Sequence, residues 1–263
     1  MKYFKYLFLI SLLISSCSKE EKVSIPGQVI ITGHITNYNE EANHDFVNLV
    51  YFDVVENRNT ITQFIDDSCN FKIVIDNLYR PKEIWLGYGY FLRFYIKPGD
   101  SLHFEIDSKA LGRNYSTSEL YSFYKVTGSS ETINKDVAAY KSLLSESFGR
   151  EFNHEQNKAI KNLSPDEYKA STEIYLKKKE SIAHNYISNH NPSNEFVEWV
   201  EYDLKFEQWE DLIRYWWLHP LENQQIPLEF LENIPESYFD FLDTGFLLSQ
   251  SPVLKNYNML PIT

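Results

Sequence analysis

Apolar and polar residues alternate through the first half of the chain. Between Gln28 and about Val126 the apolar residues form short period-two runs, which turn-forming residues separate. The runs are Val29–Ile35, Phe46–Phe52, Ile61–Ile65, Phe71–Ile75, Ile84–Tyr88, Phe91–Ile96 and Leu102–Ile106. Short strands at this spacing, without a helical stretch between them, are typical of an antiparallel sandwich or barrel. The pattern therefore predicts an antiparallel β-domain over residues 28–128.

One connection in this region is specific enough to predict a register. Two successive runs each place three apolar residues on one face: Leu92, Phe94 and Ile96 in the first, and Leu102, Phe104 and Ile106 in the second. In a hairpin, the three-residue loop Pro98–Asp100 would align these faces, whereas a two-residue loop would oppose them. We therefore expect this hairpin, with Gly99 or Asp100 at positive φ. Its other face would pair Arg93 with Glu105.

Near Glu131 the spacing of the apolar residues becomes helical. The segment Glu131–Phe148 carries a helical apolar stripe, and Ser164–Glu167 has the capping residues that open a second helix, expected to end near Asn189. Pro192–Ser193 opens a third helix, which His219–Pro220 is expected to end. Short helical pieces are expected at about residues 228–232, 235–243 and 251–257. The predicted class is α+β: an antiparallel sandwich or barrel, then an all-helical segment over residues 129–263.

The first residues read as an export signal. Met1–Ser16 has a basic start, an apolar stretch too short to span a bilayer, and small residues before Cys17. A cysteine at this position resembles the lipobox of bacterial lipoproteins, in which the thiol receives a diacylglycerol. The sequence therefore predicts a signal peptide over residues 1–16, lipidation of Cys17 and a tether over residues 17–27. The expected location is the outer membrane of the cell envelope, with the periplasmic and the surface face both open.

Charge and cysteine content narrow the classes of function. Removing residues 1–16 takes away two lysines and no acidic residue, which moves the formal net charge from −12 to −14. Such a chain repels nucleic acid and anionic lipid, so we expect no nucleic acid partner and membrane attachment through the lipid on Cys17. Once Cys17 is lipidated, Cys69 is the one remaining cysteine, and it has no partner for an internal disulfide or a redox pair.

Four segments resemble a known module. They are Phe71–Ile75, Pro81–Leu86, Tyr95–Asp107 with its Lys-Pro-Gly-Asp-Ser-Leu turn, and Val126–Asp136 with its Gly-x-x-x-x-x-Asn-Lys-Asp pattern. Together they are similar to the β-domain and helical linker that precede the thioredoxin domain in Bacteroidota lipoproteins of the thiol–disulfide oxidoreductase type. The resemblance implies this fold and compartment. Members of that family continue into a thioredoxin domain with Trp-Cys-x-x-Cys, to which no position here corresponds, so no catalytic residue is carried over. Cys69 stands where the family usually has a glycine in its early hairpin.

The remaining candidates for chemistry lie mainly on the predicted third helix. Five acidic residues lie on the same helix as the tryptophans, on the side away from the aromatic stripe, and we interpret them as its solvated face: Glu198, Glu201, Glu207, Glu210 and Asp211. Trp216 and Trp217 are adjacent and cannot both face inward, so one of them is the candidate contact for a partner. The histidines do not form a metal-ligand pattern, and no metal or cofactor is expected.

These observations favour a lipid-anchored envelope protein without catalytic activity of its own, which binds a partner or serves a thiol–disulfide system as its accessory part. Two alternatives stay open. The chain could be a truncated or split thiol–disulfide oxidoreductase, whose redox domain is missing or supplied by a partner. It could also capture glycans or peptides at the cell surface. The ligand itself stays unknown.

Overall fold

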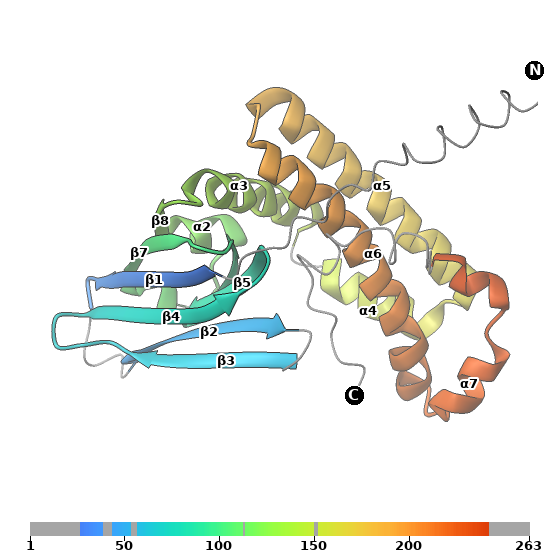
Figure 1. Cartoon of the computed structure of the whole chain (residues 1–263). Coiled ribbons are helices and arrows are strands. Elements are labelled where there is room, and N and C mark those ends of the chain that lie inside the picture. Colours follow the sequence, from blue (N-terminus) through green and yellow to red (C-terminus); the bar gives the residue numbers. More distant parts are fainter. Residues whose placement is uncertain (1–26, 39–43, 54–56, 113, 150–151, 242–263) are drawn as a thin grey trace, which may run out of the picture.

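The computed structural model describes residues 27–38, 44–53, 57–112, 114–149 and 152–241 (Figure 1). The predicted signal peptide, Cys17 and the helical piece at residues 251–257 lie outside the described residues. Over the described ranges the chain has the predicted α+β class, with an N-terminal sheet domain followed by helices.

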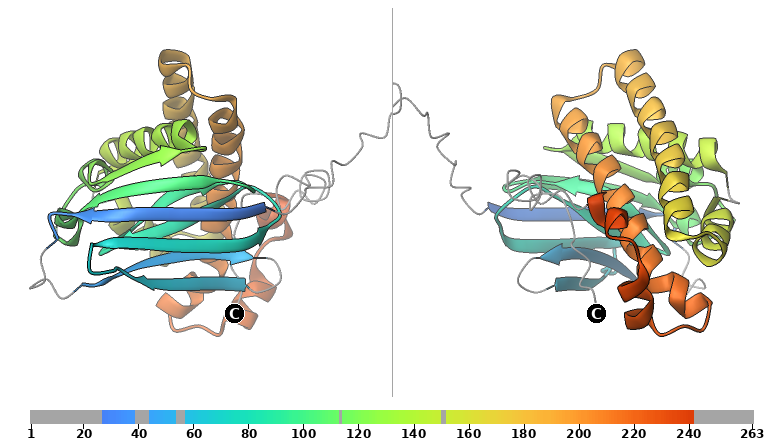
Figure 2. Two further views of the ribbon diagram at one scale, coloured as in Figure 1. Left: turned by 60° about the vertical axis from the view of Figure 1, so that its left-hand side comes forward. Right: turned by 90° about the vertical axis from the view of Figure 1, so that its right-hand side faces the viewer.

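The β-domain is a sandwich of two four-stranded sheets. Its strands are Gly27–Thr36 (β1), Phe46–Asp53 (β2), Asn57–Phe64 (β3), Asn70–Leu78 (β4), Lys82–Tyr88 (β5), Tyr90–Ile96 (β6), Ser101–Asp107 (β7) and Tyr124–Gly128 (β8). One sheet has the strand order β4-β1-β7-β8 and the other the order β3-β2-β5-β6 (Figures 1 and 2). All pairs are antiparallel except β1 and β7, which are parallel. The alternating apolar residues of both sheets meet in one core.

The predicted hairpin around Pro98–Asp100 is wrong. Strand β6 pairs with β5 and strand β7 with β1 and β8, so the turn passes from one sheet to the other. The two apolar faces do meet, but across the sandwich, where the rings of Phe94 and Phe104 are 4.9 Å apart. Alternation fixes which face of a strand is apolar, and it does not distinguish a neighbour in the sheet from one across the core. Gly99 does adopt positive φ, at 86°.

Six α-helices are described. They are Thr117–Ser122 (α2), Glu131–Phe148 (α3), Phe152–Asn162 (α4), Pro165–His190 (α5), Asn194–Glu222 (α6) and Pro227–Asn233 (α7). Two 3-10 segments, Ser108–Leu111 and Glu236–Phe241, complete the list. The sequence predicted the start of α5 at its Ser164–Glu167 capping box, and this is confirmed. It did not predict α2, although Ser116 and Glu119 form a capping box there as well, and it did not predict α4.

Helix α6 continues past the proline that was expected to end it. Pro220 lies within the last turn, and the helix extends to Glu222. A proline removes one helical donor, but the backbone carbonyls around it still have partners. The N–H of Asn223 donates to the carbonyl of His219 at 3.1 Å, and the N–H of Gln225 donates to the carbonyl of Pro220 at 2.8 Å. Pro220 thus removes only the bond to the carbonyl of Trp216, and the carbonyls of His219 and Pro220 keep partners as the helix runs on to Glu222.

The helices lie on one side of the sandwich. Helix α3 runs along the edge of the β-domain, and α5 and α6 lie side by side beyond it (Figure 2). Tyr95 of β6 shares a buried cluster with α3, α5 and α6, which includes Tyr140, Tyr186 and Trp199. A second cluster, around Tyr168, Tyr215 and Tyr238, lies farther along the helices. The first of these clusters joins the helical segment to the β-domain.

Candidate functional site

The outer face of strands β5 and β6 is covered by helices. Because side chains alternate along a strand, Ile84 and Phe94 face the sandwich core while Glu83, Arg93 and Tyr95 face the helices. Glu83 and Tyr95 are buried there. We call this contact between β5–β6 and helices α3, α5 and α6 the junction.

An amide side chain attaches α3 to the edge of β6. The Asn134 side chain accepts a hydrogen bond from the Tyr95 N–H at 2.7 Å and donates one to the Tyr95 carbonyl at 2.9 Å. It therefore pairs with the strand as a neighbouring strand would. Next to it, Asp100 accepts hydrogen bonds from the hydroxyls of Ser129 and Ser130 at 2.8 and 2.6 Å. The Lys-Pro-Gly-Asp turn and the Asn134 segment, both singled out in the sequence, thus meet at the junction.

Behind this attachment, α3, α5 and α6 contribute a cluster of charges. Lys141 of α3 lies 2.7 Å from Asp203 and 3.0 Å from Glu207, both on α6. Lys179 of α5 lies 2.8 Å from the other oxygen of Glu207. Asp203 is buried, and the side chains of Lys141 and Lys179 are only 11% and 13% exposed. The cluster therefore joins three helices through ion pairs that are largely withdrawn from water.

The β-domain adds two more charges to the cluster. One nitrogen of Arg93 lies 3.5 Å from Glu83, 3.7 Å from Asp203 and 3.9 Å from Glu207. Glu83 and Arg93 belong to neighbouring strands, so the guanidinium connects the sheet with α6. Three carboxylates thus face three cations across the junction.

The surroundings shift the pKa values of these groups in opposite directions. Burial raises the pKa of Glu83, with a further contribution from Asp203, against the attraction of Arg93. Burial would also raise the pKa of Glu207, but the charges of Lys141, Lys179 and Arg93 outweigh it and lower that pKa well below its usual range. The Oε2 atom of Glu83 is buried without a hydrogen-bond partner. Glu207 is thus the ionised centre of the cluster, while burial favours the protonated form of Glu83.

The structure corrects the interpretation of the acidic residues on α6. Glu198, Glu201 and Glu210 are exposed, as predicted. Glu207 lies in the charge cluster, and Asp211 is largely covered, with Gln156 donating to it at 3.3 Å. Burial raises the pKa of Asp211 to about 6. The helical pattern of α6 could not show this, because the cations around Glu207 come from α3, α5 and β6.

A groove opens beside the charge cluster. It has a volume of about 410 Å³ and lies where β6, α2, α3 and α4 meet α5 and α6. Its polar lining consists mainly of Arg93, Lys141, Lys179 and Glu207, and its aromatic lining of Phe91, Tyr121, Phe148 and Phe152. The sequence analysis did not identify this groove, because its residues come from six separate elements.

The two adjacent tryptophans near the end of α6 lie in different surroundings. Trp216 packs against the cluster around Tyr215 and Tyr238, whereas Trp217 is 42% exposed. Their rings meet edge to face, with centroids 5.8 Å apart. Trp217 is therefore the one of the pair that a partner could reach, and its role as a contact stays a prediction.

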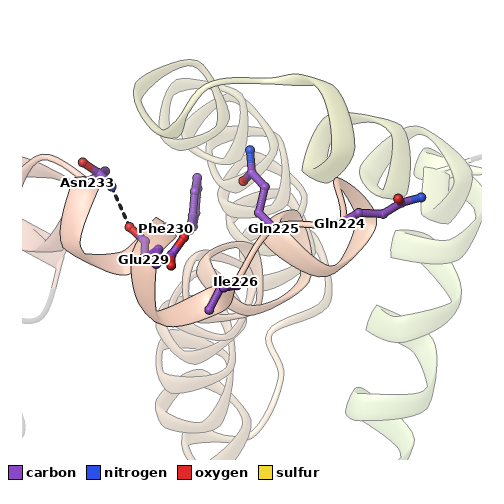
Figure 3. Close-up of a pocket in the computed structure, with 6 residues that line it drawn as sticks. All are labelled: Gln224, Gln225, Ile226, Glu229, Phe230 and Asn233. Atoms are coloured by element: carbon purple, nitrogen blue, oxygen red, sulfur yellow. Dashed lines mark hydrogen bonds between the residues drawn. The ribbon is translucent and has the colours of Figure 1, made fainter.

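Further apolar side chains are exposed at the same end of the helical segment. Leu221 lies one helical turn after Trp217, and Ile226 and Leu228 begin α7, with Leu228 65% exposed. We call the segment from Trp217 to Asn233 the helical tip. It contains a pocket of about 530 Å³, lined by Gln224, Gln225, Ile226, Glu229, Phe230 and Asn233. Gln225 and Phe230 extend to the same side of the turn, whereas Gln224 points away from them (Figure 3).

The helical tip and the segment after it are acidic. Residues 215–241 contain five carboxylates and neither lysine nor arginine: Glu222, Glu229, Glu232, Glu236 and Asp240. All five are exposed. Lys161 of α4 lies 3.9 Å from Glu222. The tip thus combines apolar side chains with a negative rim.

The outer face of the other sheet is polar. Thr32 and His103 are hydrogen-bonded at 3.0 Å, His34 and Asn70 at 3.1 Å, and Lys125 and Glu105 at 2.6 Å. Cys69 lies in the turn between β3 and β4 at a φ of 60°, in the left-handed region that favours glycine. It is half-buried against the sandwich core.

Within the described ranges, no three histidine, cysteine or acidic side chains come together as metal ligands, and no helix has the length and apolarity needed to cross a bilayer. Comparison of the chain with family models, curated proteins and solved structures finds no match. The site must therefore be interpreted from its own residues.

Proposed function

We propose that this protein is a non-catalytic binding protein of the cell envelope, anchored through a lipid on Cys17, and that it binds a protein partner at the helical tip. The observation that carries the proposal is the exposure of Trp217, Leu221, Ile226 and Leu228 at one end of the helical segment. Single exposed apolar residues are common on proteins, but a group of large ones is typical of an interaction surface. Tryptophan is also among the residues that contribute most at interfaces.

The charge of the tip defines the chemistry of the partner. Because its rim is acidic and carries neither lysine nor arginine, it favours a segment with apolar and basic side chains. The apolar side chains would supply most of the binding free energy. The carboxylates would accelerate association and select against acidic partners. We therefore expect the affinity to fall as the salt concentration rises.

A direct test uses the chain from Cys17 onward and two synthetic helical peptides of leucine with either lysine or glutamate. We expect the leucine–lysine peptide to bind in fluorescence anisotropy. The double variant Trp217→Ser/Leu221→Ser should weaken this binding by about thirtyfold, because it removes about 2 kcal/mol of apolar contact. The variant should still fold, with the free energy of unfolding lower by about 1 kcal/mol, because Trp217 and Leu221 are 42% and 51% exposed and lose only part of their packing.

Ile174→Ser is the matched control, since Ile174 is an exposed apolar residue on α5, away from the tip. It should leave peptide binding unchanged. Equal binding of the leucine–glutamate peptide, or equal losses in the two variants, would refute the proposal. The wild type could instead self-associate in sedimentation experiments. If Trp217→Ser/Leu221→Ser abolished that self-association, the tip would bind a second copy of this chain and not another protein. Glycan-array binding that Trp217→Ala abolishes would replace it by a saccharide.

The anchor has its own test. In a bacterial host, the wild-type protein should incorporate labelled palmitate and fractionate with the outer membrane. The variant Cys17→Ser should incorporate no label and should leave the membrane fraction, because the lipid on Cys17 is the proposed attachment to the membrane. Cys69→Ser is the control and should retain both label and location. Membrane retention of the Cys17→Ser variant would contradict the anchor.

A further inference from the structure

The pocket at the turn into α7 is the concave part of the helical tip. Its volume is about 530 Å³, which lies in the range of ligand sites. Its wall combines one carboxylate with three amide side chains and two apolar side chains: Glu229, then Gln224, Gln225 and Asn233, and finally Ile226 and Phe230. Because the wall carries a negative charge and no positive one, it favours a cationic group.

The polar side chains of the pocket offer acceptors to such a group. The Nδ2 atom of Asn233 donates to the Glu229 carbonyl at 2.6 Å, so the Oδ1 atom of Asn233 is available as an acceptor. Gln225 extends its amide to the same side of the turn (Figure 3). The carboxylate of Glu229 is exposed and forms no ion pair with any residue that the structure describes. A cation in the pocket would thus gain a carboxylate that no internal cation already neutralises.

Phe230 adds an aromatic surface beside these acceptors. Its ring stacks on His219, with centroids 4.7 Å apart. The Nδ1–H of His219 donates to the Ile160 carbonyl at 2.7 Å, so the ring behind Phe230 is itself fixed. Phe230 is half-buried and reaches the pocket on the same side as Gln225 (Figure 3). The face of an aromatic ring attracts cations, and this attraction adds to that of the carboxylate.

A guanidinium fits this wall better than an ammonium does. It has five N–H donors in one plane, whereas an ammonium has three around a point. The acceptors are spread over Glu229, Asn233 and Gln225, so several donors can be used at once. A guanidinium can also bond a carboxylate through two parallel hydrogen bonds and stack on an aromatic ring, and it is more weakly hydrated. The pocket therefore favours arginine over lysine.

We propose that this pocket binds an arginine side chain of the partner segment, with the guanidinium paired with Glu229 and stacked on Phe230. The inference rests on the proposed function, in which the partner carries apolar and basic side chains, and it specifies which basic side chain is selected. Trp217 and Leu221 bind the apolar residues of that segment, and the pocket fixes its position on the tip.

An NMR titration of the chain from Cys17 onward tests the pocket without the partner. The probes are N-acetyl-arginine amide, its lysine counterpart and its citrulline counterpart, which has a neutral urea of the same shape as the guanidinium. We expect the arginine probe to shift the side-chain amide signals of Gln225 and Asn233. The lysine probe should bind about fivefold more weakly, and the citrulline probe at least about tenfold more weakly, because its hydrogen bonds are not charge-assisted. Equal binding of the arginine and citrulline probes would overturn the proposal.

A single variant locates the site. Glu229→Gln keeps the size of the side chain and removes its charge, and we expect it to weaken binding of the arginine probe by about tenfold. Glu210→Gln is the matched control, since Glu210 is an exposed carboxylate of α6 outside the tip. It should leave binding unchanged. Equal losses in the two variants would indicate an effect of net charge alone and would refute the site.

The pocket and the proposed partner surface can fail separately. The arginine probe could bind in a way that depends on Glu229 while the leucine–lysine peptide does not bind. That result would support the pocket and refute the apolar partner surface. The peptide could instead bind through Trp217 and Leu221 while the three probes bind equally, which would refute the pocket and support the partner surface.

Discussion

Helix α6 passes through two opposite surroundings. At the junction, its carboxylates Asp203 and Glu207 are withdrawn from water and paired with Arg93, Lys141 and Lys179. At the helical tip, its apolar residues Trp217 and Leu221 are exposed. Both regions therefore differ from the usual arrangement of a surface helix: carboxylates are covered in the middle of α6, and large apolar side chains are exposed near its C-terminal end.

The difference shows which region of α6 is used for contacts within the molecule and which is exposed for contacts with another molecule. At the junction, each buried charge has a partner supplied by another element, so that surface is already used within the molecule. At the tip, large apolar side chains face solvent beside a rim of carboxylates, which is typical of a surface that binds another molecule. Changes at the junction should therefore affect folding, and changes at the tip should affect binding.

The largest effect is expected at the centre of the junction. Glu207→Gln would leave Lys141 and Lys179 without the charge that they share, and we expect it to lower the free energy of unfolding by about 3 to 5 kcal/mol in urea titration at pH 7. Because folding lowers the pKa of Glu207, its contribution is present above the unfolded pKa of about 4.3 and is lost as the pH falls below it. The difference from the wild type should therefore shrink in acid.

Glu210→Gln is the matched control on the same helix, since Glu210 is exposed. It should change the free energy of unfolding by less than about 0.5 kcal/mol. Two results would contradict the difference between junction and surface. One is a comparable loss of unfolding free energy in the two variants, and the other is a loss below about 1 kcal/mol for Glu207→Gln.

A smaller loss is expected where α3 meets the sheet. Asn134→Ala would leave the N–H and the carbonyl of Tyr95 without their partner, and we expect the free energy of unfolding to fall by about 2 to 3 kcal/mol. Amide hydrogen exchange at Tyr95 should become faster, because its hydrogen bond is lost. Asn162→Ala, at an exposed asparagine of α4, is the control. Unchanged exchange at Tyr95 would show that the amide does not hold the edge of β6.

The smallest effect is expected between the two regions, at Asp211. Burial raises the folded pKa of Asp211 to about 6, above the unfolded value of about 3.9, so the wild type loses stability as the pH rises from about 4 to 6. Asp211→Asn does not titrate and can still accept the bond from Gln156. The pKa of about 6 already includes the attraction of Lys179 and Arg214, which acts against burial. We expect the variant to be more stable by about 1 kcal/mol at pH 8 and equal to the wild type below about pH 4.

Urea titrations at pH 3.5 and pH 8 would measure this difference. A variant less stable than the wild type at pH 8 would mean that the attraction of Lys179 and Arg214 exceeds the cost of burial. Asp211 would then belong to the charge cluster. The region of α6 that is used for contacts within the molecule would extend one turn farther toward the tip.

Much of the local structure was predictable from particular residues. Alternation located strands β1 to β7, and the Ser164–Glu167 capping box located the start of α5. The capping box at Ser116 and Glu119 marks the start of α2 in the same way. The motifs around Asp100 and Asn134 were singled out in sequence, but their meeting at the junction was not, because hydrogen bonds between distant segments leave no local pattern.

The candidate sites were less predictable. The sequence identified Trp216 and Trp217 as a pair of which one faces outward, and the structure places Trp217 outside. It assigned Glu207 to a solvated face, and it gave no sign of the groove. Helical periodicity describes one helix at a time, whereas the surroundings of Glu207 depend on Lys141 and Lys179 from two other helices.

The sequence by itself determined the α+β class, the apolar face of most strands and the starts of the longer helices, since these follow from spacing and from caps within a few residues. Only the tertiary structure decided that β6 and β7 lie in different sheets, that Asp203 is buried and that Glu207 is largely covered. All three depend on contacts between residues far apart in the chain, such as Lys141 with Asp203, 62 positions away. Local spacing fixes which face of an element is apolar, but burial and pairing are set by whichever element packs against that face.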